Sequence, residues 1–332
     1  MKIADEKIVV SGMRPTGSLH IGHYFGVLKN WVKLQEKFRC YFFVADWHSL
    51  TTEYEQVNLL QKYLVDMVVD WLAAGVDPQK AVLFVQSQVP EHAELHLLLS
   101  MITPISWLER VPSYKDLRQE LKGKDLSTYG FLGYPLLQTA DVLLYKASQV
   151  PVGLDQAPHI ELAREIVRRF NFLYQKEVFP EPQTLLTEFP KILGIDGRKM
   201  SKSYDNCINL SDPVEESDKK LMKCITDPAR KRREDPGNPD VCTIYSYHRL
   251  TTPDGTLKEI DRDCRTAAIG CVDCKKILIK NINEELAPFR ERRKNISSKE
   301  VAEVLIEGNQ KARQVAKQSL LEANAAMGLV GK

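Results

Sequence analysis

The feature of this chain that most constrains its fold is an alternation of short apolar runs with amphipathic stretches through its first half. Residues 40–46 are almost entirely apolar, as expected of a strand that is buried on both faces. Further strand-like runs lie at residues 8–12, 81–86 and 150–152. Helical patterns lie at about residues 20–37, 54–74, from 91 onward, 134–146 and 156–172. Strands that alternate with helices predict an α/β fold, a Rossmann-like, doubly wound parallel sheet with helices on both faces.

The strand pattern stops near residue 206, and the rest of the chain is predicted to be helical. Polar, proline-rich connectors separate the helical stretches, and residues 299–327 are typical of a long helix pair. A length of 332 residues suits about two domains. We therefore expect a Rossmann-like domain over residues 1–206 and an all-helical domain over residues 207–332, with the C-terminal helix available to pack back on the first domain.

Charge and hydropathy argue against several classes of protein. The 46 Lys and Arg residues nearly balance the 44 Asp and Glu residues, and a net charge of +2 does not suit a histone-like protein that coats nucleic acid by bulk charge. No apolar run approaches the roughly 18 residues that a membrane helix needs. The first residues carry acidic groups and no apolar signal core, so we expect a cytoplasmic protein with no membrane or DNA partner.

The seven cysteines, an odd number, suggest reduced thiols rather than a disulfide framework. Four of them have the spacing C-x21-C-x6-C-x2-C in the last third of the chain, and the closing CxxC is a metal-chelating spacing. By spacing alone, structural zinc fits at least as well as an iron–sulfur cluster. Buried free thiols explain Cys40, Cys207 and Cys224 well and the CxxC poorly. The predicted metal ligands are Cys242, Cys264, Cys271 and Cys274.

Two short segments carry residues that suit a polyphosphate. Residues 15–23, PTGSLHIGH, follow a strand and open a helix whose N–H groups and positive dipole end favour phosphate. His20 and His23 share one face of the first turn, and Gly22 between them leaves a gap for a flat base. Residues 198–203, RKMSKS, lie on a glycine-flanked loop whose two lysines can close over a polyphosphate. Taken alone, each segment also fits an ordinary surface helix or a solvated basic loop.

Together, in this order and on either side of the predicted sheet, the two segments resemble the HIGH and KMSKS signatures of class I aminoacyl-tRNA synthetases. Residues 12–17, 44–48, 134–141 and 150–156 also resemble the tryptophanyl and tyrosyl subclass, and they depart from it at Leu154, where that family usually has Glu. Over essentially its whole length the chain is similar to the bacterial tryptophanyl-tRNA synthetases.

A polar triplet within the resemblance suggests how the amino acid is recognised. Tyr134, Gln138 and Asp141 fall at i, i+4 and i+7, which places them on one face of a helix. An indole N–H is only a donor, so a buried Asp141 carboxylate is a suitable acceptor for tryptophan. The same carboxylate can accept a hydrogen bond from a tyrosine hydroxyl. The triplet therefore leaves both amino acids open, and the overall resemblance favours L-tryptophan.

The resemblance also implies the reaction and its residues. The tryptophan carboxylate attacks the α-phosphorus of ATP in the presence of Mg²⁺, which gives tryptophanyl-adenylate and pyrophosphate, and the tryptophanyl group then passes to the 3′ end of tRNA(Trp). Tyr134 and Gln156 would hold the amino and carboxylate groups, and Asp155 the ATP ribose. The implied catalytic residues are His20, His23, Lys115, Lys199 and Lys202. The implied ATP-binding residues are Arg14, Thr16, Gly22, His23, Asp155, Lys199, Met200, Ser201 and Lys202. The implied tryptophan-binding residues are His48, Tyr134, Gln138, Asp141 and Gln156.

The same resemblance implies a cofactor and a partner subunit. The four-cysteine set resembles that of a subset of bacterial tryptophanyl enzymes that bind a [4Fe-4S] cluster in the anticodon-binding domain, although those have one more residue in the first gap. Zinc in the same site is the alternative. The family is homodimeric, and the apolar residues 97–102, with Ile105 and Leu108, fit either a dimer interface or the core.

Three other functions stay open at this point. A tyrosyl-tRNA synthetase would share the pocket triplet, and a non-catalytic synthetase paralogue would act as an RNA-binding or regulatory module. Intact His20, His23, Lys199 and Lys202 argue against such a paralogue. A nucleotidyltransferase for small cofactors would share the HIGH-like segment, but it needs neither a helical anticodon domain nor a KMSKS loop at this distance.

Overall fold

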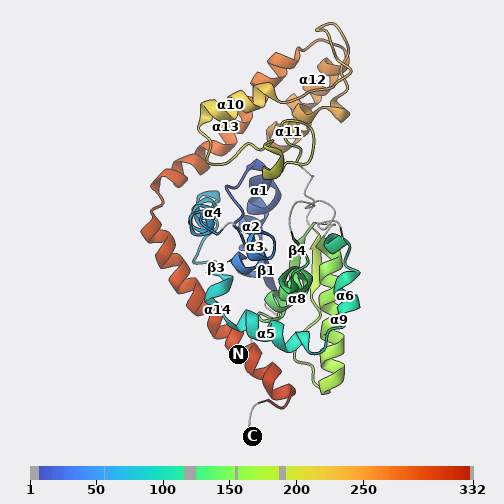
Figure 1. The fold of residues 1–332 in the computed structure, drawn as a ribbon. Coiled ribbons are helices and arrows are strands. Elements are labelled where there is room, and N and C mark those ends of the chain that lie inside the picture. Colours follow the sequence, from blue (N-terminus) through green and yellow to red (C-terminus); the bar gives the residue numbers. More distant parts are fainter. Residues whose placement is uncertain (1–6, 56, 116–124, 154–155, 187–191, 330–332) are drawn as a thin grey trace.

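A sheet of five parallel strands lies at the centre of the molecule. The computed structural model describes residues 7–55, 57–115, 125–153, 156–186 and 192–329. The strand order is β3-β2-β1-β4-β5, and each neighbouring pair is parallel, which confirms the predicted doubly wound sheet (Figure 1). The strands are β1 (Ile8–Met13), β2 (Arg39–Val44), β3 (Ala81–Val85), β4 (Gln149–Val152) and β5 (Gln183–Leu186).

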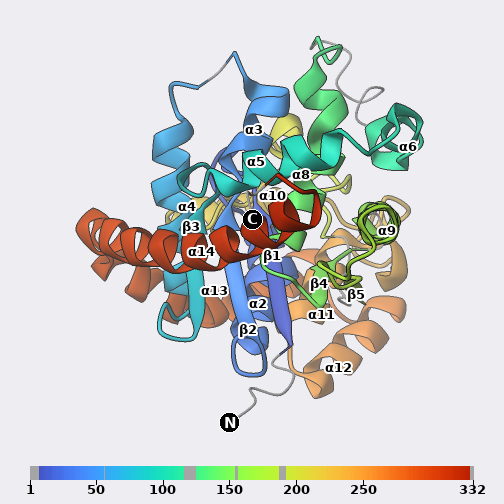
Figure 2. The same ribbon diagram turned by 90° about the horizontal axis from the view of Figure 1, so that it is seen from below.

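Helices cover both faces of this sheet because successive strand residues point to opposite sides (Figure 2). Val9 and Phe42 face one core, which they share with η1, α2 and α4. Val10 and Phe43 face a second core, which they share with α5, α8 and α9. The helices of this half are α1 (Ile21–His23), the π-helical turn η1 (Tyr24–Leu28), α2 (Lys29–Leu34), α3 (Asp46–Glu53), α4 (Leu60–Ala74), the 3-10 turn η2 (Gln86–Gln88), α5 (Glu91–Ser100), α6 (Ile105–Glu109), α8 (Tyr129–Leu143) and α9 (Ala157–Tyr174).

Two helix boundaries differ from the sequence prediction. The stretch expected to form one helix over residues 54–74 is helical only from Leu60, and a separate helix, α3, precedes it. Helix α8 begins at Tyr129, several residues before the predicted start, because the hydroxyl of Thr128 accepts a hydrogen bond from the backbone N–H of Phe131 at 3.2 Å and caps the helix.

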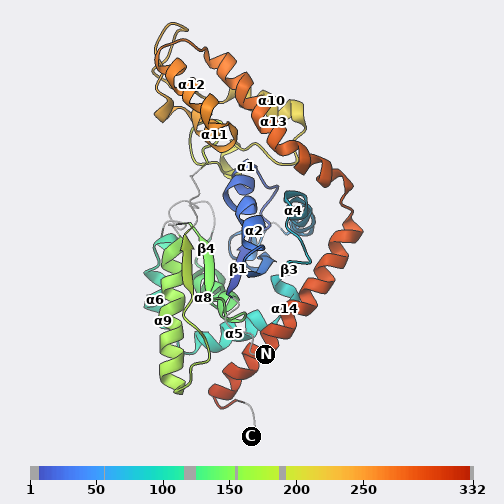
Figure 3. The same cartoon turned by 180° about the vertical axis from the view of Figure 1, so that it is seen from behind.

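After residue 206 the described residues form helices and loops, as predicted. The chain ends in one long helix rather than a helix pair, and Figures 1 and 3 show it running along the β3 side of the molecule. None of the helices in the described part is long and apolar enough to cross a membrane. The boundary at residue 206 stays a prediction. The remaining elements are the 3-10 turns η4 (Lys202–Tyr204) and η5 (Pro239–Val241), and α10 (Val214–Lys223), α11 (Thr243–Thr251), α12 (Asp254–Arg265), α13 (Cys271–Asn295) and α14 (Ser298–Ala326).

Helix α14 packs against the edge strand β3. The side-chain oxygen of Asn309 accepts a hydrogen bond from the backbone N–H of Val85 at 2.9 Å. At Gly308 the two backbones are so close that a Cβ atom would lie 1.7 Å from the carbonyl oxygen of Leu83. The helix therefore covers the edge of the sheet, and this contact requires glycine at position 308.

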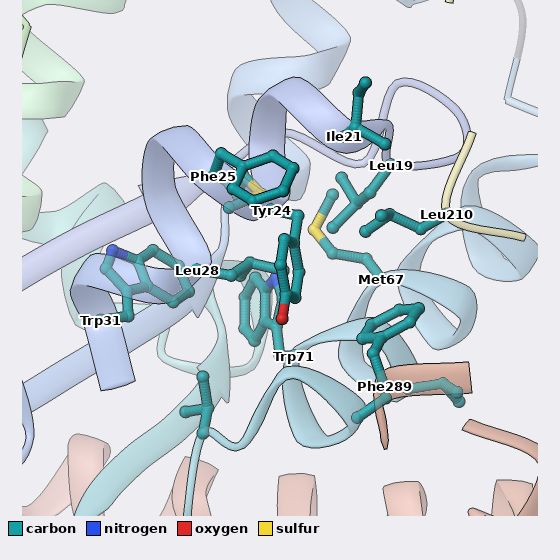
Figure 4. Close-up of a cluster of buried hydrophobic side chains, with 14 of the residues drawn as sticks. Leu19, Ile21, Tyr24, Phe25, Leu28, Trp31, Met67, Trp71, Leu210 and Phe289 are labelled. Carbon is teal, nitrogen blue, oxygen red and sulfur yellow. The ribbon is translucent and has the colours of Figure 1, made fainter. Parts of the chain in front are cut away.

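Helix α13 is joined to α4 by apolar and polar contacts. Phe289 lies in the same buried cluster as side chains of α1, η1 and α4 (Figure 4). Arg293 Nε donates to Asp70 Oδ1 at 2.7 Å, and Arg292 Nε donates to the carbonyl of Ala73 at 2.6 Å. The basic run at the end of α13 is thus partly an anchor between the two halves of the chain rather than only a solvated face.

Candidate active site

A short backbone pairing brings the two signature segments together. The N–H of Ile21 donates to the carbonyl of Ile208 at 3.0 Å, and the N–H of Leu210 donates to the carbonyl of Leu19 at 2.8 Å. Because residues 208–210 come only a few residues after the RKMSKS loop, this pairing holds the loop beside the PTGSLHIGH segment. The site therefore forms at the carboxyl end of β1, where ligands bind in open parallel sheets.

The rings of His20 and His23 lie against each other at the start of α1, tilted by 41°. Their ring centroids are 3.8 Å apart, and the backbone N–H of His20 donates to Nδ1 of His23 at 3.2 Å. Burial lowers the pKa of His20 to about 4, and burial, with His20 and Lys202 nearby, holds the pKa of His23 well below its usual range. Both rings are therefore neutral, and His23 carries its proton on Nε2. The sequence suggested a gap for a flat base beside Gly22. In the structure the His20 ring itself occupies the space next to Gly22.

Lys202 turns inward over the first segment, whereas Lys199 is exposed. The Lys202 Nζ atom would lie only 3.2 Å from a Cβ atom at Gly17, whose φ of +129° suits glycine. Met200 is buried beside this lysine. The side chain of Asn206 shapes the loop, accepting from the N–H of Ser201 at 2.8 Å and donating to the carbonyl of Lys199 at 3.1 Å.

The titration of Lys202 predicts proton uptake when ATP binds. Burial, with a smaller contribution from Arg14, lowers the pKa of Lys202 to about 8. A bound polyphosphate favours the charged ammonium and raises that pKa again, so ATP should bind with uptake of protons at about pH 8.5. Calorimetric titration in two buffers with different heats of ionisation measures this uptake. It should be larger in the natural protein than in Lys202→Met, and the difference should vanish at about pH 6.5.

A cavity of about 330 Å³ opens at the carboxyl end of β1, and it collects side chains that lie far apart in the sequence. A second cavity of about 300 Å³ shares Gln138, Asp141 and Gln156 with it. All five predicted tryptophan-binding residues line the first cavity, together with Arg14, which donates a hydrogen bond to the hydroxyl of Thr52. Those five residues are His48, Tyr134, Gln138, Asp141 and Gln156.

Asp141 of α8 is buried and interacts with three hydrogen-bond donors. Gln86 Nε2 donates to Oδ1 at 2.8 Å, His92 Nδ1 lies 2.6 Å from Oδ1, and His48 Nε2 lies 2.8 Å from Oδ2. Burial, the largest influence, opposes ionisation, but the hydrogen bonds from His48 and His92 lower the pKa of Asp141. An ionised carboxylate has about four acceptor positions, so these three donors leave one for a ligand.

The structure adds polar residues that the sequence did not suggest. Ser113 Oγ lies 3.2 Å from the Tyr134 hydroxyl and 3.0 Å from His159 Nε2, and all three residues line the cavity. Gln86 follows β3 directly, and polar side chains at the carboxyl end of a parallel strand are the one sequence signal that points to it. His92 gave no such signal, because its contact with Asp141 joins residues that are distant in the chain.

Of the remaining predicted residues, Thr16 and Lys115 do not line this cavity. Thr16 lines a neighbouring cavity of about 390 Å³. Lys115 is exposed at the end of a described stretch. Asp155, the predicted partner of the ATP ribose, lies outside the described residues.

The four spaced cysteines occupy neighbouring elements of the helical half. Cys242 precedes α11, Cys264 lies in α12, and Cys271 and Cys274 lie in the first turn of α13; all four are partly buried. Burial, followed by the other three thiols, raises the pKa of Cys274 to about 12, and His248 Nε2 lies 3.3 Å from its Sγ atom. Within the described ranges, no group of three or more His, Cys, Asp or Glu side chains is arranged so that it could hold a metal ion.

Two arginines of the basic run at residues 230–233 form hydrogen bonds and contacts with the segment from α12 to α13 that carries the cysteines. Arg230 Nη2 donates to the carbonyl of Ile269 at 2.8 Å, and its Nη1 atom lies 3.9 Å from Cys264 Sγ. Arg233 Nη2 donates to the carbonyl of Ala268 at 2.9 Å. These guanidinium groups therefore have a structural role beside the cysteines.

The sequence and the fold of this chain are similar to those of known synthetases. Residues 2–287 match the family described as tRNA synthetases class I (W and Y). The chain is 55% identical to the tryptophan–tRNA ligase of Thermotoga maritima and 47% identical to that of Aquifex aeolicus, in each case over 97% of this chain and 99% of the relative. Its fold is similar to that of tryptophanyl-tRNA synthetase from Campylobacter jejuni complexed with ADP and tryptophan, with a TM-score of 0.86 and 33% identity over 97% of this chain and 100% of the other.

The pairing of the two signature segments, the polar cavity at the end of β1 and the similarity along the whole length thus agree. The chain belongs to the class I tRNA synthetases of the tryptophan and tyrosine family and, within it, to the bacterial-type tryptophan–tRNA ligases.

Proposed function

We propose that the cavity at Asp141 binds the tryptophan that this ligase activates, and that the paired signature segments bind the phosphates of ATP. One observation carries the proposal: the five predicted tryptophan-binding residues, from three separate segments, line one cavity. Asp141 keeps an acceptor position for the indole N–H, and Tyr134 and Gln156 supply polar atoms for the amino and carboxylate groups. ATP and Mg²⁺ are the companions expected of a class I synthetase.

The chemistry of this arrangement is in-line displacement at phosphorus. A carboxylate oxygen of tryptophan forms a bond to the α-phosphorus, and the bond from that phosphorus to the bridging oxygen breaks, so pyrophosphate leaves with the electron pair. Lys199 and Lys202 would neutralise the charge that builds up on the phosphate oxygens, and the neutral rings of His20 and His23 would donate hydrogen bonds there. Catalysis then depends on positioning and charge, with no protein nucleophile.

Isotopic pyrophosphate exchange with single amino acids tests the assignment of the cavity. Tryptophan should support exchange, and tyrosine should support about a hundredfold less, because the smaller phenol ring would leave part of an indole-sized cavity unfilled. Exchange that is equally fast with tyrosine would contradict the assignment. A chain that forms no adenylate with any amino acid would instead support a non-catalytic RNA-binding role.

We propose in addition that the four spaced cysteines bind a [4Fe-4S] cluster, with zinc as the alternative. The four thiols are donors that suit either group, although in the described structure they are not arranged as a metal site. They are close enough to raise one another's pKa, and a bound cation would relieve that repulsion. Arg230 and His248 place N–H groups beside two of the sulfur atoms, as expected around thiolate ligands. When bound, the cluster would cross-link α11, α12 and α13.

Elemental analysis after anaerobic purification tests the metal. We expect about four iron atoms per chain and a brown protein. Cys271→Ala should lose the iron, and the matched variant Cys224→Ala, which changes a buried thiol outside the set, should keep it. Zinc without iron would contradict the cluster and favour the alternative.

Homodimer formation stays a prediction. In the structure, some residues of the apolar run that suggested it are exposed and others are buried in the core. Leu97, Met101 and Ile105 are 56%, 68% and 61% exposed, whereas Leu99 and Leu108 are buried in the core. The exposed three fit an interface between two copies of the chain. The molar mass in solution, measured by light scattering, decides between one copy and two.

A further inference from the structure

A buried polar network continues behind Asp141, away from the substrate cavity. Gln86 and His92 both contact its Oδ1 atom, and neither lines the two cavities at the site. The second ring nitrogen of His92, Nε2, lies 2.8 Å from the hydroxyl of Tyr145. His92, Gln86 and Tyr145 are all fully buried, so the network is closed to solvent.

The direction of the hydrogen bonds in this network is fixed by chemistry. Burial, with the charge of Asp141 nearby, holds the pKa of Tyr145 well above its usual range, so its hydroxyl keeps the proton. The ionised Asp141 carboxylate only accepts hydrogen bonds, so Nδ1 of His92, which faces it, carries the ring proton, and in the neutral ring Nε2 accepts from the Tyr145 hydroxyl. Nδ1 then donates to Asp141.

Two donors on Oδ1 leave the orientation of the carboxylate little freedom. Without them, the Asp141 carboxylate is able to rotate toward His48, which contacts its other oxygen from the cavity side. A buried carboxylate that rotates no longer presents the same acceptor position to a ligand. The network thus acts on the part of the site that faces the substrate, although it touches no ligand itself.

We propose that Tyr145 and His92 are positioning residues, which hold Oδ2 of Asp141 toward the indole N–H and so set the preference for tryptophan over an analogue without that N–H. This inference rests on the proposed role of Asp141 in tryptophan binding. Loss of the hydrogen-bonded chain would weaken the contact with the N–H and leave the apolar contacts of the ring unchanged.

The test uses β-(3-benzothienyl)alanine, in which sulfur replaces the indole N–H. The measured quantity is the ratio of kcat/KM for tryptophan to kcat/KM for the analogue in pyrophosphate exchange. Tyr145→Phe should lower this ratio about tenfold, mainly by raising the KM for tryptophan, with little change in kcat. The matched variant Tyr174→Phe removes a hydroxyl from a tyrosine of the same apolar core, whose ring packs on Phe170 at 4.8 Å, and it should leave the ratio unchanged.

Two variants of His92 separate positioning from packing. His92→Ala should lower the ratio at least as much as Tyr145→Phe. His92→Asn, whose amide nitrogen lies near the place of Nδ1, should restore part of the ratio because it again donates to Asp141. Thermal unfolding identifies any variant that fails to fold, and the comparison uses the folded ones.

The outcomes distinguish this inference from the proposed function. If Tyr145→Phe and His92→Ala fold and both keep the natural ratio while Asp141→Asn loses it, the positioning role is wrong and the role of Asp141 stands. If the natural protein shows no preference between the two substrates, or Asp141→Asn keeps it, the role of Asp141 itself is wrong and the inference is overturned with it.

Discussion

Lys202→Ala is expected to slow tryptophanyl-adenylate formation about a hundredfold or more, while the affinity for tryptophan changes little. The Lys202 ammonium lies over Gly17, between the two signature segments, and it does not line the cavity that holds the predicted tryptophan-binding residues. A charge aimed at the phosphates acts mainly where charge develops in the transition state, and removing one such group typically costs two to three orders of magnitude.

Single-turnover adenylate formation and equilibrium binding of tryptophan together check this expectation. Lys258→Ala, which removes an exposed lysine from α12, is the matched control and should leave both quantities unchanged. Equal losses in the rate and in tryptophan affinity would show that Lys202 supports the pocket as a whole rather than the phosphates.

Asp141→Asn is expected to lower kcat/KM for tryptophan about a hundredfold or more, mainly through a higher KM. The substitution keeps the volume of the side chain but removes the charge, and it places an NH₂ group among three donors. Removing one partner of a buried, charge-assisted hydrogen bond costs about 2–5 kcal/mol, which corresponds to a loss of this size.

Steady-state exchange kinetics, accompanied by thermal unfolding, measure the effect of this substitution. Asp125→Asn changes an exposed carboxyl and is the control, for which we expect natural kinetics. A folded Asp141→Asn protein with an unchanged KM for tryptophan would contradict the proposed role.

The sequence predicted the parts of the fold that depend on local pattern. Apolar runs located β1, β2, β3 and β4, whereas β5 is a short edge strand, Gln183–Leu186, with too few apolar residues to be recognised. A helix pair was expected at the C-terminus, where one long helix forms, and its course along β3 depends on Gly308 and on a side-chain contact of Asn309. Such long-range contacts leave no periodic trace in the sequence.

The residues of the site also fall into two groups, those that local sequence pattern predicts and those that only the folded structure brings together. The signature segments were recognised from residue types and spacing, and the triplet in α8 was recognised from helical periodicity. The network of Gln86, His92 and Tyr145 was not, because hydrogen bonds between residues about fifty positions apart become visible only when the sheet and helices are assembled. For the same reason Arg230 and Arg293, which look like parts of solvated basic runs, prove to be structural anchors.

The central claim is that Asp141 accepts a hydrogen bond from the indole N–H of tryptophan, and one measurement tests it most directly. Pyrophosphate exchange is measured for the natural protein with tryptophan and with β-(3-benzothienyl)alanine, which fills the same space without the N–H donor. We predict a preference for tryptophan of at least about a hundredfold, because the buried carboxylate would be left with an unpaired acceptor facing sulfur. Similar kcat/KM values for the two substrates would contradict the claim.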